Sequence, residues 1–215
     1  MNRYLLILGG LLSFTAQTGL AQSGPDYQLR IPTHFQFGAS GNGETGNQFG
    51  LAGWAIFPNV MADKGQGSFL FVAGALWRAN PSGSWIEFMV GNRFNRSGYT
   101  DPLVNIRFSN NHPKGVNLYG EAGYFFREIR KRSYALVAVD VPVPIGKSGL
   151  RLGIESENTH FPTKPDSWGI GPRVVIPLPP VLFSKMRFSV ATAYQCFRTD
   201  RAFIRTYVTT TIKNP

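Results

Sequence analysis

From residue 47 onward the chain alternates apolar and polar residues in segments of about ten residues, and most segments end at Pro, Gly, Asn or Asp. In Ser84–Phe94, for example, Phe88 and Val90 fall on one face. Glu87 and Met89 fall on the other face. Because successive side chains of a strand point to opposite sides, each segment predicts a strand with one apolar and one polar face.

The composition of the two faces indicates which one points inward. The polar face carries Gly, Asn, Ser, Glu and above all Arg, whereas the polar face of a soluble sandwich is usually rich in Lys, Glu and Thr. Aromatic residues lie near the segment ends, where a membrane barrel has its interfacial girdle: Trp77, Trp85, Tyr124, Trp168 and Tyr194. We therefore expect an all-β chain that forms an antiparallel, up-and-down transmembrane β-barrel with its polar face inside.

The number of strands depends on how the N-terminal part is counted. Residues 47–215 divide into ten alternating segments, and an even number is usual for bacterial single-chain barrels. Residues 22–46 contain one more alternating segment, Ile31–Ser40. This segment could be an N-terminal extension, a plug in the lumen or an additional strand. We expect ten strands, with twelve as the alternative.

The N-terminus has the features of a secretory signal. Arg3 is followed by a short apolar run, Tyr4–Leu12, and by small residues before a cleavage site after Ala21. The run is too short to span a bilayer as a helix, which needs about 20 apolar residues. Residues 1–21 are therefore predicted to be a cleaved signal peptide. Because Cys196 is the one cysteine in the sequence, a disulfide within the chain is excluded.

The alternation over Gln22–Pro215 resembles that of bacterial outer-membrane β-barrel proteins as a class. The resemblance implies a location in the bacterial outer membrane and contact with the lipid bilayer. It is one of pattern, without a diagnostic motif. Members of the class commonly end in an aromatic residue, whereas this chain ends at Pro215 with Tyr207 as its last aromatic residue. A soluble exported barrel that binds a lipid or small ligand remains an alternative, in which Arg107, Arg173 and Arg187 would face bulk water.

Charged residues on the predicted inner face form the candidate functional site, because charge facing lipid is costly. The expected lumen residues are Glu87, Arg93, Arg107, Glu121, Arg151, Glu155, Arg173, Arg187 and Arg205. Six arginines against three glutamates predict a positive interior. Such an interior could favour small anionic solutes in a narrow pore, or could be a packed ladder of ion pairs in a structural membrane protein.

A second basic group, Arg127, Arg130, Lys131 and Arg132, occupies one predicted turn. On the outer side of the membrane it could contact lipopolysaccharide phosphates, and otherwise it is a solvated turn. The formal net charge of the chain is +10, but the positive residues are spread along the strands. Together with export, this distribution argues against nucleic acid as a partner.

Catalytic chemistry has weak support in the sequence. Ser109 and His112 have the residue types of a nucleophile and its base, so a barrel lipid hydrolase or acyltransferase is the enzymatic alternative. However, His112 precedes Pro113 in a predicted tight turn rather than lying on a strand beside Ser109. His34, His160 and Cys196 show no metal-ligand spacing, and we predict neither a metal site nor a cofactor.

Overall fold

The computed structural model of the 215-residue chain describes residues 26–39, 48–57, 68–79, 84–95, 98–110, 115–127, 131–145, 149–178, 186–197 and 202–213. These residues form strands and turns, and no helix long and apolar enough to cross a membrane occurs among them. The strands are β1 (Asp26–Ala39), β2 (Gln48–Phe57), β3 (Ser68–Ala79), β4 (Ser84–Asn95), β5 (Thr100–Asn110), β6 (Asn117–Phe125), β7 (Arg132–Pro142), β8 (Arg151–Phe161), β9 (Lys164–Pro177), β10 (Met186–Phe197) and β11 (Ala202–Lys213).

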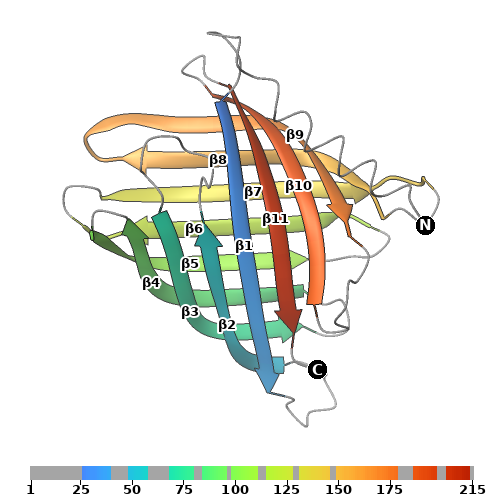
Figure 1. The fold of residues 1–215 in the computed structure, drawn as a ribbon, viewed down its shortest axis with the longest axis horizontal. Coiled ribbons are helices and arrows are strands. Elements are labelled where there is room, and N and C mark those ends of the chain that lie inside the picture. The colour runs from blue at the N-terminus through green and yellow to red at the C-terminus, as the bar shows by residue number, and fades with distance from the viewer. Residues whose placement is uncertain are drawn as a thin grey trace.

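The strands close into one barrel in which each strand is antiparallel to the next along the chain. The exception is the closing pair, because β1 and β11 run parallel from Asp26↔Phe203 to Gln36↔Lys213. Figure 1 shows these two strands side by side and pointing in the same direction. We call this pair the seam.

The prediction of an all-β barrel is confirmed, whereas the counts of ten and of twelve strands are both wrong. The described residues form eleven strands, and their sheet is mixed rather than fully antiparallel. The segment Ile31–Ser40 overlaps β1, which pairs with β2 from Ile31↔Phe57 to Ala39↔Phe49. An odd number of up-and-down strands places the first and last strands in the same direction, so closure requires a parallel pair.

The outer face of the barrel is apolar. On β4, Val90 is 65% exposed and Phe88 is also exposed, whereas Glu87 is fully buried. Exposed apolar side chains recur around the barrel, including Leu51, Val139 and Ile154. Among the outward-facing strand positions whose side chains the structure describes, the ionisable pair His160 and Asp166 lies where β8 turns into β9.

The interior holds both apolar and polar side chains. A cluster of buried apolar residues lies inside β2–β6 and includes Trp54, Val72, Leu76 and Leu103. Trp85 belongs to this cluster and is 7% exposed, so the prediction that it lies in an outer aromatic girdle is wrong. It shares the face of Glu87, two residues along β4, and therefore points inward.

The other four expected girdle residues, Trp77, Tyr124, Trp168 and Tyr194, are exposed. They lie on the outer face, in contrast to Trp85.

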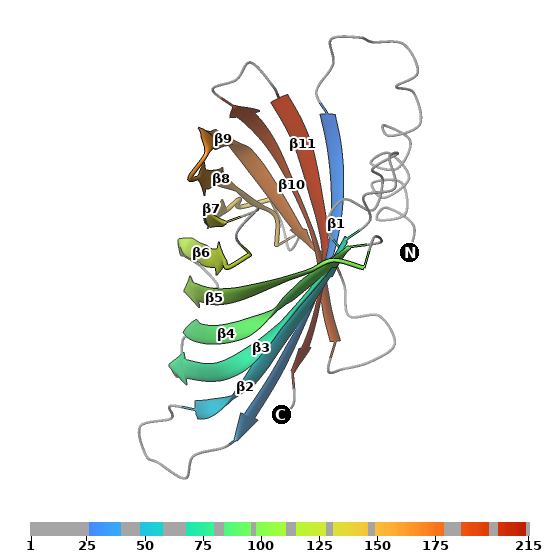
Figure 2. The same cartoon turned by 90° about the vertical axis from the view of Figure 1, so that its left-hand side faces the viewer.

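Two glycines allow β3 and β4 to approach closely. A Cβ atom on Gly74 would lie 2.0 Å from the carbonyl oxygen of Phe88, and one on Gly91 would lie 2.0 Å from that of Phe71. Only residues without a side chain fit at these positions. The strands also curve along their length, as Figure 2 shows for β2–β5.

Candidate functional site

Buried polar side chains gather in two groups inside the barrel. The first, which we call the β1–β7 cluster, consists of His34, Gln36, Trp54, Arg78, Glu87, Asn105, Arg107, Tyr119, Glu121 and Tyr134. The second, which we call the seam cluster, consists of Arg30, Glu155, Glu157, Arg173, Gln195, Arg205 and Tyr207. Each group combines carboxylates with arginines and neutral donors.

A row of opposite charges crosses three neighbouring strands in the β1–β7 cluster. Glu87 of β4 lies directly across from Arg107 of β5, which lies directly across from Glu121 of β6. Opposite charges at such facing positions stabilise a sheet. The Nη2 atom of Arg107 donates to Oε1 of Glu121 at 2.8 Å, and Arg107 is 1% exposed.

The carboxylate of Glu87 is satisfied by three neighbouring side chains. Its Oε1 atom lies 2.6 Å from Nε2 of His34 and accepts a hydrogen bond from Gln36 at 2.8 Å. Its Oε2 atom accepts one from the indole of Trp54 at 2.7 Å. The imidazole of His34 stacks on that indole with ring centroids 3.9 Å apart. Because a buried charge is costly without partners, these contacts hold Glu87 inside the barrel.

The carboxylate of Glu121 is also enclosed by donors. Besides Arg107, the hydroxyl of Tyr119 donates to it at 2.9 Å and that of Tyr134 at 2.7 Å. The guanidinium of Arg107 lies 4.4 Å from the ring centroid of Trp54, which itself donates to Glu87. The contacts therefore join both carboxylates into one continuous network.

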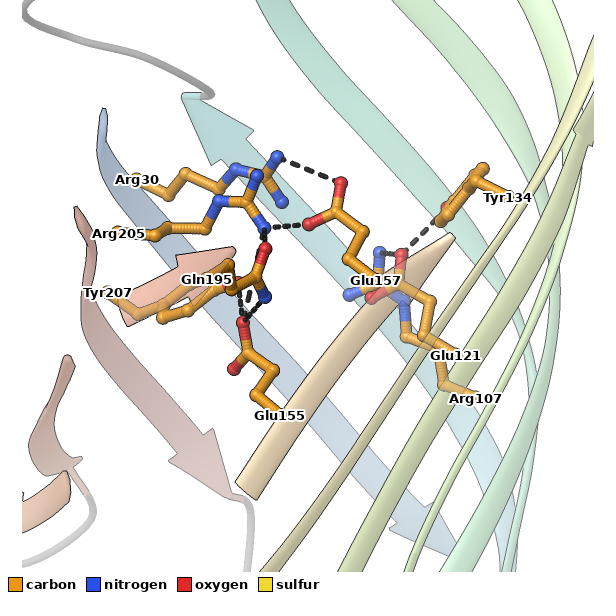
Figure 3. Close-up of polar contacts among 9 residues, drawn as sticks. All are labelled: Arg30, Arg107, Glu121, Tyr134, Glu155, Glu157, Gln195, Arg205 and Tyr207. Carbon is orange, nitrogen blue, oxygen red and sulfur yellow. Dashed lines mark hydrogen bonds and ion pairs between the residues drawn. The ribbon is translucent and has the colours of Figure 1, made fainter. Parts of the chain in front are cut away.

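The seam cluster connects β1 and β11 to β8–β10. Arg30 of β1 contacts Glu157 of β8 at 3.4 Å, and Arg205 of β11 pairs with the same carboxylate. Figure 3 shows both guanidinium groups directed at Glu157. Deeper in the cluster, Arg173 donates to Glu155 at 2.5 Å, and Arg205 lies 4.0 Å from Glu155.

Two neutral side chains complete the environment of Glu155. The amide of Gln195 donates to it at 2.7 Å, and the hydroxyl of Tyr207 donates at 2.8 Å. The oxygen of the same Gln195 amide accepts from Arg205 at 3.1 Å. Glu155 and Gln195 are fully buried, so water has little access to this part of the interior.

The structure brings six of the nine sequence-predicted lumen residues into these clusters: Glu87, Arg107, Glu121, Glu155, Arg173 and Arg205.

The other three predicted lumen residues lie elsewhere. Arg151 donates to backbone oxygens of Gly115 at 2.6 Å and of Asp140 at 2.9 Å. Arg93 is half-buried on β4. Arg187 lies opposite Thr211 in the register of β10 and β11, and its side chain is outside the described part of the chain.

Several residues of the two clusters were not singled out from the sequence. Arg30, Arg78 and Glu157 share the inward face of their strands with buried residues, so alternation could have marked them. The aromatic members Trp54 and Tyr207 could not be assigned this way, because their apolar rings suit either face and only their donor groups contact the carboxylates.

One of the two weak catalytic candidates lies among the described residues. Ser109 is buried on the inner face of β5, and His112 lies outside the described residues. His160 has its Nδ1 atom 2.6 Å from Asp166 in an exposed pair at the β8–β9 end. Within the described residues no group of three or more His, Cys, Asp or Glu could hold a metal ion.

No protein-family model, no curated protein and no solved structure matches the chain. The fold and the site define a closed, mixed β-barrel of eleven strands with an apolar exterior and a buried, charged interior.

Proposed function

We propose that the chain is an exported bacterial outer-membrane barrel that forms a narrow, anion-favouring pore. The observation that carries the proposal is the contrast between the two faces of the strands. Val90 and Ile154 are exposed outside, while Glu87, Arg107 and Glu155 are buried inside. Apolar side chains outside and polar side chains inside are what a barrel surrounded by lipid needs.

A soluble ligand-binding barrel would have the reverse arrangement. Soluble monomers rarely expose apolar patches larger than a few hundred Å². Here the exposed apolar residues run around the barrel, from Leu51 on β2 through Val139 on β7 to Tyr194 on β10. Arg107, which the soluble alternative places in bulk water, is buried. These features favour the membrane proposal.

The preference for anions follows from the charge of the inner face. Counting inward strand positions with described side chains, eight arginines stand against six carboxylates, a surplus of two positive charges. The arginines are Arg30, Arg78, Arg93, Arg107, Arg132, Arg151, Arg173 and Arg205. The carboxylates are Glu87, Asp101, Glu121, Asp140, Glu155 and Glu157. Charged groups that line a pore select ions of opposite sign.

The size of the permeant solute is limited by the filled interior. Gln36, Glu87, Glu155 and Gln195 are fully buried, so side chains rather than a wide channel occupy the middle of the barrel. The same observation favours a second candidate, a structural membrane protein whose ion pairs close the lumen. Conductance separates these two functions, since only the pore carries current.

Export and lipid contact complete the proposal. The predicted signal, residues 1–21, lies outside the described residues. At one rim, Arg127 lies 4.7 Å from the ring centroid of Tyr99, and Lys131 is exposed. These two cations could meet lipopolysaccharide phosphates there. Arg132 instead turns inward to Asp101 at 3.2 Å, and Arg130 is outside the described residues.

Fractionation of a Gram-negative host that expresses the full chain tests the membrane part of the proposal. We expect the protein in the outer-membrane fraction, resistant to extraction with alkaline carbonate. A folded protein that is recovered from the soluble periplasm would overturn the proposal. Near-ultraviolet circular dichroism of the recovered material establishes that it is folded, so aggregation is not mistaken for membrane insertion.

A further inference from the structure

The seam cluster is an alternating chain of five charges that begins and ends with arginine. In order of contact its members are Arg30, Glu157, Arg205, Glu155 and Arg173. Two carboxylates therefore face three guanidinium groups, which leaves one positive charge without a matching negative charge in the cluster.

The β1–β7 cluster differs in this respect. Its two arginines, Arg78 and Arg107, are balanced by Glu87 and Glu121. Arg78 makes its described hydrogen bonds to the side-chain oxygens of Gln36, at 2.7 Å, and Gln48, at 3.0 Å. The positive surplus of the paired network is thus located at the seam rather than spread evenly around the interior.

Burial in the seam cluster decreases toward Arg30. The side chain of Arg30 is 24% exposed and that of Glu157 is 16% exposed, whereas Arg205 is 3% exposed and Glu155 is fully buried. Arg30 also makes the longest hydrogen bond of the cluster, 3.4 Å to Glu157. A guanidinium carries five N–H donors, so this contact uses a small part of its capacity.

A second observation concerns Arg173. Its Nε atom is buried and has no hydrogen-bond partner, as is also true of the Nε atoms of Arg78 and Arg151, although the guanidinium of Arg173 pairs with Glu155 through Nη1. Buried donors of this kind are usually satisfied, so each calls for an explanation. Arg30 and Arg173 both lie 5.9 Å from the ring centroid of Tyr207, so both guanidinium groups are near this ring.

We propose that the seam cluster binds a small inorganic oxyanion of the phosphate type, with Arg30 as the group that receives it from water. The planar fork of arginine fits two oxygens of such an anion, and the unmatched positive charge favours its entry. The oxyanion competes with Glu157 for the donors of Arg30 and Arg205. The site rests on the proposed pore for its access route, and it makes Arg30 a determinant of anion preference.

Isothermal titration calorimetry with inorganic phosphate tests the site. The full-length protein, folded in a maltoside detergent that lacks phosphate, is titrated at constant ionic strength with gluconate as the background anion. Replacing Arg30 by Gln removes a charge-assisted hydrogen-bond donor, and we expect at least about a tenfold weaker phosphate affinity. Arg30→Lys keeps the positive charge but lacks the planar guanidinium, so its phosphate affinity should lie between those of the wild type and Arg30→Gln.

Two further variants distinguish specific phosphate binding at the seam cluster from nonspecific attraction of phosphate by the positive interior. Arg78→Gln makes the same change of charge in the balanced β1–β7 cluster and should leave phosphate affinity within about twofold of the wild type. Glu157→Gln removes the competing carboxylate from Arg30 and Arg205 and should tighten binding. Circular dichroism and thermal unfolding establish that each variant is folded.

The proposal is overturned if folded wild-type protein does not bind phosphate, or if Arg30→Gln and Arg78→Gln weaken binding equally. Conductance of the same preparations distinguishes this result from a failure of the pore. Electrically silent protein with Arg30-dependent phosphate binding supports the site and contradicts the pore. If the protein is anion-selective but Arg30→Gln does not change its phosphate affinity, the phosphate site is refuted and the pore is supported.

Discussion

Replacing Val90 by Arg tests whether the outer face of the barrel contacts lipid. Val90 is 65% exposed on β4, with Ala73 and Val104 opposite it on the neighbouring strands. It lies six residues from Ser84 and five from Asn95, the two ends of the strand. At ~3.4 Å per residue and a tilt of ~45°, Val90 lies about 12 Å from the nearer end along the barrel axis, close to the middle of a ~25 Å apolar band.

The depth of the substituted residue sets the expected cost. An arginine that faces lipid at the midplane lowers the free energy of unfolding by about 2–4 kcal/mol, and one near the interface by about 0–1 kcal/mol. Val141 supplies the matched control, because it is also an exposed valine and lies one residue from the end of β7. Val90→Arg should therefore destabilise the barrel more than Val141→Arg.

Urea unfolding in lipid vesicles measures this difference. Tryptophan fluorescence follows unfolding, and refolding from urea establishes that the transition is reversible. In water, exposed substitutions usually change stability by less than about 0.5 kcal/mol, whatever their position along a strand. Equal stabilities of the two variants, within about 0.5 kcal/mol, would refute the assignment of this face to lipid.

Two further substitutions test the interior and the strand packing. Glu121→Gln leaves buried Arg107 without its ion-pair partner and should lower the free energy of unfolding by about 3–5 kcal/mol in urea titration; a loss below about 1 kcal/mol would contradict the network. Gly91→Ala places a Cβ atom 2.0 Å from the backbone oxygen of Phe71 and should cost about 1–3 kcal/mol. At Gly53 an added Cβ atom would meet its nearest atom at 3.2 Å, so Gly53→Ala should cost less than Gly91→Ala in the same urea titration, and an equal or larger cost would contradict the close approach of β3 and β4.

Strand positions could be predicted from the sequence because alternation depends only on which residues are apolar. β2 ends at Phe57 and β3 begins at Ser68, and in the sequence Pro58 and Gly67 interrupt the alternation between them. The strand number could not be predicted in the same way, because β1 looks like any other alternating segment. Its parallel pairing with β11 depends on contacts between the two ends of the chain, which no local pattern encodes.

The interior contacts were only partly predictable for a related reason. Alternation places Glu87 and Glu155 on the inner face, but each has a hydrogen-bond partner on a strand that is not its neighbour. His34 lies 53 positions from Glu87, and Tyr207 lies 52 positions from Glu155. These contacts depend on how the barrel closes and on the stagger between its strands, so they cannot be predicted from the alternation along the sequence. The residue type of Trp85 favours an outer girdle, but Trp85 lies two positions from Glu87 on β4 and so shares its inward face.

The central claim, a narrow anion-favouring pore, is tested most directly by single-channel recording. Purified protein is inserted into a planar lipid bilayer under a potassium chloride gradient, and the reversal potential gives the sign of the preferred ion. The positive surplus of the inner face predicts small conductance steps with a preference for chloride. A preference for potassium, or no steps from protein shown to be inserted, would contradict the pore.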